Sequence, residues 1–221
     1  MNDNFENVIE MILQKKTEPV KSDLDSEEEE DEEENDKFLG AKKFVNLEEA
    51  KMSSKLQILI SQLKQLKPGD KAIVYSQFTS FLNLIGLTFE QEKMNYERLD
   101  GTMSHSKRAS SIHNFKTNPN VNIFLISLKA GGVGLNLTEA NKLWLVDPWW
   151  NPSIENQARD RVYRLGQVRP VQVFRFVMKG SIEERILELQ KKKEALSEGV
   201  LNFDIKKVSK LTKKDVEMLL S

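Results

Sequence analysis

The sequence predicts an α/β fold, with a parallel β-sheet that is covered by helices on both faces. Segments with strand and helix patterns alternate from Met52 to about residue 196, and such alternation is typical of a parallel sheet. The stretch VNIFLIS at 121–127 is apolar at nearly every position, as expected for a strand that is buried on both faces. Because ligands of such sheets bind at the carboxyl ends of the strands, we expect the functional residues in the loops that follow the strands.

The elements are expected in a regular order. Ser53 or Ser54 can cap a first helix, whose apolar residues recur at helical spacing and which stops at the turn KPGD. A serine stands at the start of a later helix, and Thr212 can cap a last one. The strands are expected at 71–76, 96–99, 121–127, 142–146 and 171–177, and the further helices at 78–92, 104–116, 152–165 and 181–196.

Charge divides the chain near residue 50. Residues 1–50 hold 17 Asp and Glu against 6 Lys and Arg, whereas the remaining residues hold 17 acidic and 27 basic side chains. The block SDLDSEEEEDEEEND at 22–36 has no basic residue, and its self-repulsion predicts disorder. It is either a solvated linker or a segment that mimics nucleic acid or binds histones. We therefore expect an acidic, largely disordered segment at 1–50, a folded lobe at 51–180 and a C-terminal helical extension at 181–221 that packs on the lobe.

Composition excludes several classes of site. The 221-residue chain has no cysteine, which excludes disulfides, zinc sites built from thiolates and a cysteine nucleophile. His105 and His113 are its two histidines, so we expect no metal site. The sequence has no apolar run of membrane-spanning length and no secretion-signal pattern at its start. The basic charge of 51–221 indicates either a polyanionic partner or a well-solvated surface.

The loop that follows 121–127 is rich in glycine. Gly131, Gly132 and Gly134 fall within four positions, and glycine lets a backbone turn tightly and approach a ligand closely. If a helix starts here, its N–H groups can face a phosphate; the alternative is a turn that packing alone requires. The loop is not a Walker A loop, because no Gly-Lys-Ser/Thr follows.

Two further segments carry unusual side chains. Trp149 and Trp150 stand between two prolines where a strand leads into a helix. Aromatic faces in such a loop suit nucleotides and sugars, unless both rings cover the sheet edge. In the helix expected next, Gln157, Arg161 and Arg164 are spaced four and three residues apart and would share one face. Guanidinium groups in a row match phosphate oxygens, and the alternative is ion pairing with nearby carboxylates.

The ordered combination of these segments resembles the Swi/Snf-type ATPases of helicase superfamily two. KAIVYSQFT at 71–79 looks like the fourth motif of that family, and ERLDGTMSHSKRASSIHNF at 97–115 looks like the segment after it. NIFLISLKAGGVGLNLTEANKLWLVDPWWNP at 122–152 looks like the fifth motif with its extension, and ENQARDRVYRLGQ at 155–167 like the sixth. Order and gaps agree over about residues 52–196.

The resemblance is strongest to one subgroup. The Trp-Trp-Asn-Pro variant, the three lysines at 191–193 and the closing LTKKDVEMLL look most like the RING-bearing subgroup that includes helicase-like transcription factor. Members of that subgroup act in DNA-damage tolerance, excision repair or transcription. Tyr163 departs from the pattern, because the family usually has histidine there. Since the chain has no cysteine, it contains no RING itself.

The resemblance implies the RecA-like second lobe of a two-lobe motor and gives roles to particular residues. Arg161 and Arg164 match the arginine fingers that reach across the cleft to the ATP phosphates, and Gln157 matches the glutamine that begins that motif. The residues implied at the nucleotide are Gly132, Gly134 and Asn136. Those implied at the DNA surface are Gln77, Lys129 and Trp150. The implied cofactor is ATP with Mg²⁺, whose ligands are expected in the first lobe.

The expected function is that of the C-terminal lobe of an ATP-dependent translocase on double-stranded DNA. Such a protein remodels chromatin or other protein–DNA complexes in the nucleus, in DNA repair or transcription, and no membrane partner is expected. Neither the Walker A lysine nor the acidic magnesium motif is found in the sequence, so the N-terminal ATPase lobe is the expected partner and the chain alone is expected to be inactive.

Two alternatives remain open. One is a non-catalytic nucleic-acid or chromatin-binding module derived from such a lobe, against which the presence of Arg161 and Arg164 argues. The other is an unrelated α/β nucleotide-binding enzyme, which would need a complete phosphate-binding loop of its own.

Overall fold

The computed structural model describes residues 53–130, 134–198 and 212–220. These residues form a five-stranded sheet in the order β2-β3-β1-β4-β5, in which each pair of neighbours is parallel. The predicted parallel α/β fold is therefore confirmed. The predicted acidic segment at 1–50 lies outside the described residues. The strands are β1 (Ala72–Ser76), β2 (Tyr96–Leu99), β3 (Ile123–Ser127), β4 (Lys142–Leu145) and β5 (Gln172–Arg175).

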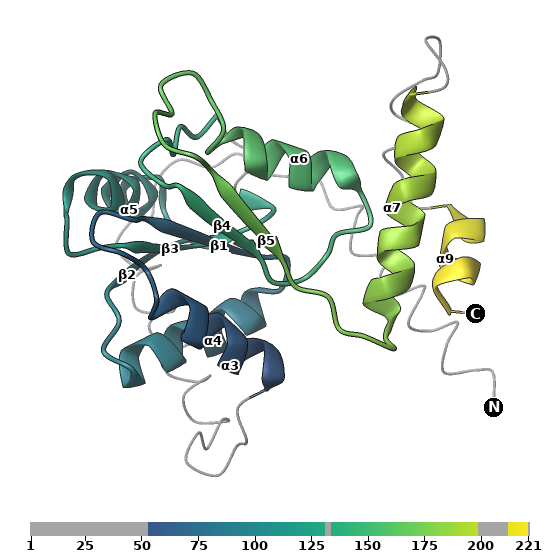
Figure 1. The fold of residues 1–221 in the computed structure, drawn as a ribbon, viewed down its shortest axis with the longest axis horizontal. Coiled ribbons are helices and arrows are strands. Elements are labelled where there is room, and N and C mark those ends of the chain that lie inside the picture. Colours follow the sequence, from purple (N-terminus) through teal and green to yellow (C-terminus); the bar gives the residue numbers. More distant parts are fainter. Residues whose placement is uncertain (1–52, 131–133, 199–211, 221) are drawn as a thin grey trace, which may run out of the picture. The chain divides into compact units, whose positions relative to one another are not determined.

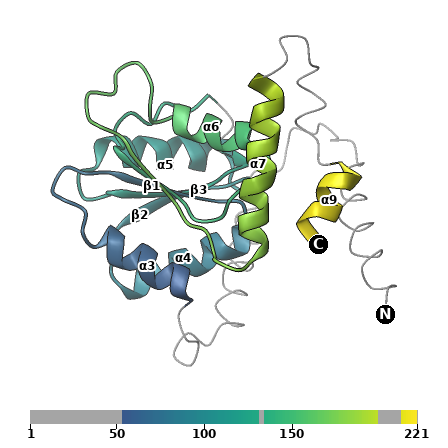
Figure 2. The ribbon, with the colours of Figure 1, turned by 45° about the vertical axis from the view of Figure 1, so that its right-hand side comes forward.

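Helices cover both faces of the sheet (Figures 1 and 2). Helices α3 (Ser54–Leu63) and α4 (Thr79–Gln91) lie on one face, and α5 (His105–Thr117) and α6 (Pro152–Asp160) lie on the other. Every residue of β1 is buried, and its side chains alternate between two cores. Val74 packs in the same cluster as Leu59 of α3, whereas Tyr75 packs with Phe115 of α5. The strand pattern of period two thus divides the interior into two hydrophobic cores.

The helix starts use the caps that the sequence predicts. The Ser53 hydroxyl accepts from the backbone N–H of Leu56 at 3.4 Å. Ser104 does the same for α5, and Thr212 accepts from the N–H of Asp215 at 3.2 Å. Each hydroxyl satisfies a backbone donor that the first turn of a helix leaves without a partner. Gly69, at the predicted stop after α3, has φ of +85°, a left-handed conformation that favours glycine.

Helix α6 is shorter than predicted. The sequence suggested a helix over 152–165, but the helix ends at Asp160 and the chain then turns. The backbone N–H groups of Arg161 and Val162 both donate to the Arg159 carbonyl, which tightens the last turn. The Arg161 carbonyl accepts the backbone N–H of Leu137, from a different segment, at 2.9 Å. Gly166 has φ of +102°, so the backbone beyond the turn is not helical.

Two helices follow the sheet. Helix α7 (Ile182–Glu198) contacts α6 and also α9 (Lys213–Leu220). The pair α7 and α9 is joined by an ion pair between Lys193 and Asp215 (3.5 Å) and by the Arg185 guanidinium, which donates to the Leu219 carbonyl at 3.1 Å. Within 53–130, 134–198 and 212–220, no helix is long and apolar enough to cross a membrane.

Candidate functional site

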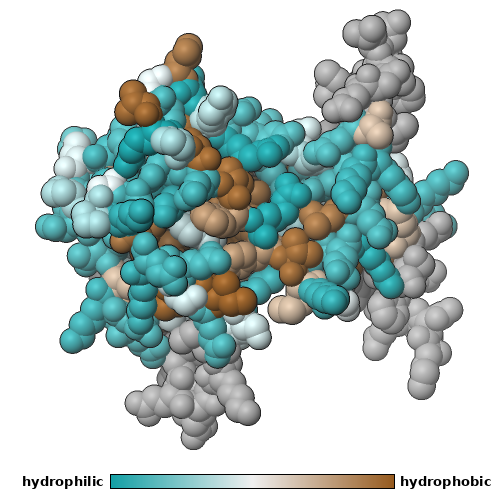
Figure 3. Space-filling view, in the orientation of Figure 1, coloured by the Kyte–Doolittle hydropathy of each residue, from teal (hydrophilic) through white to brown (hydrophobic). Residues whose placement is uncertain are grey.

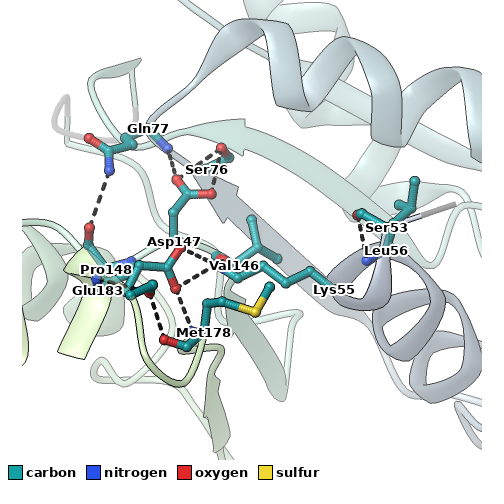
Figure 4. A network of polar contacts seen from close by, with 11 residues as sticks. Ser53, Lys55, Leu56, Ser76, Gln77, Val146, Asp147, Pro148, Met178 and Glu183 are labelled. Atoms are coloured by element: carbon teal, nitrogen blue, oxygen red, sulfur yellow. Dashed lines mark hydrogen bonds and ion pairs between the residues drawn. The ribbon is translucent and has the colours of Figure 1, made fainter.

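The loops after β1 and β4 are tied together by Asp147 (Figure 4). Its carboxylate accepts the Ser76 hydroxyl at 3.0 Å and the backbone N–H of Gln77 at 2.7 Å. The Gln77 side-chain amide donates in turn to the Pro148 carbonyl oxygen at 3.2 Å. Both the backbone and the side chain of Gln77, a residue predicted to face DNA, are therefore held against the loop that leads to the two tryptophans.

The surroundings of Asp147 act on the pKa of its carboxyl in opposing directions. The residue is only 4% exposed, and this burial raises the pKa of its carboxyl above the ordinary value. The hydrogen bonds from Gln77 and Ser76 and the positive charge of Lys55 act in the opposite direction, while the negative charge of Glu183 adds to the rise. Burial has the largest effect, so this carboxyl holds a proton more readily than an exposed aspartate.

Lys55 connects the first described helix with α7 (Figure 4). Its ammonium donates to the Val146 carbonyl at 2.8 Å and to Glu183 Oε2 at 2.7 Å. Glu183 also accepts the backbone N–H of Met178 at 2.7 Å. Since Lys55 belongs to α3, Val146 follows β4 and Glu183 belongs to α7, one lysine joins three elements beside Asp147.

The two adjacent tryptophans have different surroundings. Both are half-buried, and their ring centroids lie 5.9 Å apart. Trp149 packs against the core on the α6 side of the sheet. The ring of Trp150 lies under the ammonium of Lys193 from α7, 4.5 Å from the nitrogen to the ring centroid. One tryptophan thus belongs partly to the core, and the other contacts the C-terminal helices.

A fully buried carboxylate, Glu155, lies at the start of α6. Its Oε1 accepts the backbone N–H of Trp149 and the side-chain amide of Gln190, each at 2.8 Å. Its Oε2 pairs with the Arg175 guanidinium at 2.6 Å. A buried charge needs such partners, because an unpaired one would cost several kcal/mol. Glu155 therefore joins α6, the tryptophan loop, the end of β5 and α7.

The two arginines predicted as fingers lie in the turn that follows α6. Arg161 is half-buried, and its carbonyl accepts the N–H of Leu137. Arg164 is exposed, and one of its guanidinium nitrogens lies 3.4 Å from the Leu135 carbonyl oxygen. Both arginines are therefore beside the described end of the glycine-rich loop. Gly134 and Asn136 are exposed in the same segment.

The turn is fixed by hydrogen bonds of its side chains to backbone carbonyls. The Gln167 amide donates to the Ala140 carbonyl at 2.7 Å and to the Thr138 carbonyl at 3.0 Å. The Arg169 guanidinium donates to the Gly69 and Glu139 carbonyls. Since these carbonyls precede β1 and β4, the turn reaches the amino ends of the strands.

The positive charge of Arg161 affects the pKa of Tyr75, a residue of the core. Tyr75 is fully buried, and this burial raises the pKa of its phenol, while the nearby positive charge of Arg161 offsets part of the rise. The buried phenol of Tyr75 is therefore close enough to Arg161 for the positive charge of the guanidinium to act on it.

The predicted site residues fall into two groups. Gln77, Lys129 and Trp150 follow β1, β3 and β4 at the carboxyl ends of the strands. Arg161 and Arg164 lie instead in the turn that follows α6. The predicted shared helical face is wrong, since only the exposed Gln157 is within α6. Gly132 lies outside the described residues, and the described part of its loop, from 134 onward, begins no helix.

Sequence patterns missed several residues of these clusters. Asp147 directly follows a predicted strand, so the rule on carboxyl ends could have found it. The roles of three further residues could not be recognised from the neighbouring sequence, because their partners include residues that are distant in the chain: Lys55, Glu155 and Glu183. Among residues 53–130, 134–198 and 212–220, no group of three His, Asp or Glu side chains is arranged to hold a metal ion.

The turn after α6 also exposes apolar surface. The side chains of Leu165 and Val168 are 96% and 91% exposed, and Val173 of the edge strand β5 is 42% exposed. Figure 3 shows hydrophobic residues on this face, over β5 and toward the turn that precedes it. Exposed apolar residues that form a contiguous patch with a polar rim mark a surface to which another protein or domain can bind.

The fold and these loops define a RecA-like lobe of the helicase type. The family model for the helicase conserved C-terminal domain matches residues 54–166. The chain belongs to this helicase C-terminal domain family. The matched residues include the loop after β3, the tryptophan loop and both arginines, and the match ends before α7.

Relatives confirm the predicted resemblance to the Swi/Snf-type ATPases. The chain is 45% identical over 170 residues to the DNA repair protein rad8 of Schizosaccharomyces pombe, which covers 76% of this chain and 15% of that protein. It is 48% identical over 180 residues to the DNA repair protein RAD5 of Cryptococcus neoformans, with 75% and 15% covered. It is 41% identical over 180 residues to the ATP-dependent helicase rhp16 of S. pombe, with 80% and 21% covered. The chain thus spans between 15% and 21% of the length of these relatives.

Solved structures support the same fold. The C-terminal part of the Fun30 ATPase domain superimposes with a TM-score of 0.66 at 27% identity, covering 86% of this chain and 60% of that one. The Sulfolobus solfataricus SWI2/SNF2 ATPase core domain gives a TM-score of 0.55 at 30% identity, covering 75% and 33%.

Proposed function

We propose that the chain is the C-terminal lobe of an ATP-dependent translocase on double-stranded DNA, which works with an N-terminal ATPase lobe. Its task is the remodelling of chromatin or other protein–DNA complexes in the nucleus, in DNA repair or transcription. The observation that carries the proposal is the turn after α6, where Arg161 and the exposed Arg164 lie beside the segment that holds Gly134 and Asn136.

The residues of this turn fit a triphosphate. Guanidinium groups bind phosphate oxygens in a fixed fork geometry. Among the described residues, the Arg164 guanidinium contacts the carbonyl oxygen of Leu135. ATP with Mg²⁺, when bound, supplies the phosphoryl group and the metal that neutralises part of its charge. Arg161 and Arg164 would orient the phosphate oxygens and stabilise their negative charge, with Gln157, Gly134 and Asn136 nearby. We expect the magnesium ligands in the N-terminal lobe.

The exposed apolar residues support a lobe as partner. Leu165 directly follows Arg164, and Val168 is three residues further on. A second lobe that covers these side chains would bring its nucleotide site to the two arginines and exclude water from the guanidinium groups.

The DNA side of the proposal uses the carboxyl ends of the strands. Lys129 is exposed after β3, and Gln77 and Trp150 are held in neighbouring loops by Asp147 and by α7. A lysine and a polar amide suit contacts to phosphates, which position a protein on a duplex without a sequence preference.

Alanine variants of the arginines test the proposal in a protein that contains this chain together with its N-terminal lobe. Arg161→Ala and Arg164→Ala should each lower DNA-stimulated ATP turnover by about 10³-fold, the effect of an arginine finger in related phosphoryl transfers. Affinity for duplex DNA should change little, because many phosphate contacts share it. Arg159→Ala is the matched control, since this arginine belongs to α6 and bonds to Asn156 within the helix.

The outcome distinguishes a motor from a binding module. If both finger variants turned over ATP like the parent, the arginines would be surface residues and the proposal would be wrong. Persistent DNA binding without any ATP turnover in the parent would indicate the non-catalytic module. Thermal melting of the same variants shows whether a loss of activity comes from unfolding.

A further inference from the structure

Helix α7 contacts both tryptophans. This helix lies outside residues 54–166, which the family model matches. The Gln190 amide donates to the Trp149 carbonyl and to the buried Glu155. Three residues further along the same helix, the Lys193 ammonium lies 4.5 Å from the centroid of the Trp150 ring. Residues three apart on a helix are neighbours on one face, so one face of α7 contacts the two tryptophans in succession.

Lys193 is an unusual residue for this position. Its side chain is 6% exposed, and Asp215 of α9 is its ion-pair partner at 3.5 Å. Burial lowers the pKa of its ammonium, which the charge of Asp215 partly offsets. A methionine would fill similar space without the cost of taking a charge out of water. The cation therefore contributes something other than packing.

The contacts of the Lys193 ammonium with the Trp150 ring and with Asp215 indicate what the cation contributes. An aromatic face attracts a cation most strongly when the cation is desolvated, and the ammonium of Lys193 is nearly excluded from solvent. The same ammonium pairs with α9. Lys193 can therefore fix the orientation of the Trp150 ring and tie it to the position of both C-terminal helices.

We propose that Lys193 is a positioning residue that holds Trp150 in its DNA-binding orientation. The helices α7 and α9 would thereby set the affinity of the lobe for double-stranded DNA. This inference rests on the proposed function, because it takes Trp150 as a DNA contact. It adds a role for residues beyond Gly166, which the family match does not reach.

Binding of the 221-residue chain to a short fluorescent duplex of mixed sequence tests this role. Lys193→Met should weaken binding by about 2- to 30-fold, the range expected when a partly desolvated cation–π contact is lost. Lys193→Arg keeps a cation that can stack on the ring and pair with Asp215, so it should restore most of the affinity. Trp150→Ala should lose as much affinity as Lys193→Met, and combining it with Lys193→Met should add little further loss.

Lys191→Met is the matched control. It removes the same charge from the same helix, but Lys191 is exposed, and we expect a change below about twofold at moderate salt. Urea unfolding of all variants gives their stability. Lys193→Met leaves Asp215 without this ion-pair partner and should unfold at a lower urea concentration than the parent, so DNA binding is compared where every variant is folded.

Four results would overturn the inference. Parent-like binding by Lys193→Met would show that the lysine does not position Trp150. A full additional loss in the double variant would show that the two residues act separately. Equal losses in Lys191→Met and Lys193→Met would show a general effect of charge. If the parent chain itself did not bind duplex DNA, the DNA-binding part of the proposed function would fail, and the inference would fail with it.

Discussion

Replacing Asp147 tests how the loops at the carboxyl ends of β1 and β4 are held together. Asp147→Ala removes the acceptor of the Ser76 hydroxyl and of the Gln77 N–H. Hydrogen bonds to a charged group contribute about 1.5–3 kcal/mol each, and removing a buried charge returns part of this. We therefore expect Asp147→Ala to lower the free energy of unfolding by about 2–4 kcal/mol. Asp147→Asn keeps an oxygen acceptor and should change it by less than about 1 kcal/mol near neutral pH.

The pH dependence gives a sharper test, because burial raises the pKa of Asp147 above its model-compound value of 3.8. The folded state then binds the proton more tightly than the unfolded state does. The stability that this group contributes is fully present below the unfolded pKa and is lost as pH rises through the folded pKa. The parent should thus lose stability relative to Asp147→Asn as pH rises from about 4 toward neutrality.

Asp70 provides a control of opposite sign. Burial acts to raise its pKa, but hydrogen bonds from Asn141 and Lys142 outweigh this effect and lower the pKa. Its contribution is present above the unfolded pKa of 3.8 and lost as pH falls through the lowered folded pKa. The parent should therefore gain stability relative to Asp70→Asn as pH rises to about 5, and change little above it. Urea denaturation of the parent and both variants at several pH values measures the differences. A gain of the parent over Asp147→Asn with rising pH would refute the reasoning, because it would mean that Lys55 and the hydrogen bonds outweigh burial.

Two further predictions follow from the sequence. The purified 221-residue chain should release no phosphate from ATP above background, with or without duplex DNA, because it contains neither a Walker A lysine nor an acidic magnesium motif. DNA-dependent turnover that persists through further purification would contradict this. Deleting residues 22–36 should leave the melting temperature of the chain unchanged, because an acid run without apolar anchors has nothing to bury; a large drop would show that the segment packs on the folded part.

Local chemistry predicted the elements that depend on neighbouring residues. The apolar run VNIFLIS contains β3, which is buried throughout, because a strand covered on both faces needs apolar residues on both. Ser104 and Thr212 start their helices as expected, since a cap acts over three residues. The order of the motifs was enough to predict the family.

Interactions between distant residues could not be predicted in this way. Helix α6 ends early, and the Arg161 carbonyl just beyond it accepts the N–H of Leu137. No periodicity in 152–165 encodes this contact. The cation above Trp150 comes from α7, 43 residues later in the chain. The sequence indicated that both segments are unusual, but the partners of their residues depend on how the helices pack.

Triplex displacement tests the central claim most directly. A protein that contains this chain and its N-terminal lobe would be given duplex DNA carrying a labelled third strand, and release of that strand would be followed with ATP or with a non-hydrolysable analogue. We predict release with ATP alone, and its loss in Arg161→Ala and Arg164→Ala while binding to the duplex persists. Release that proceeds equally well without hydrolysis, or in both arginine variants, would contradict a motor that uses this lobe.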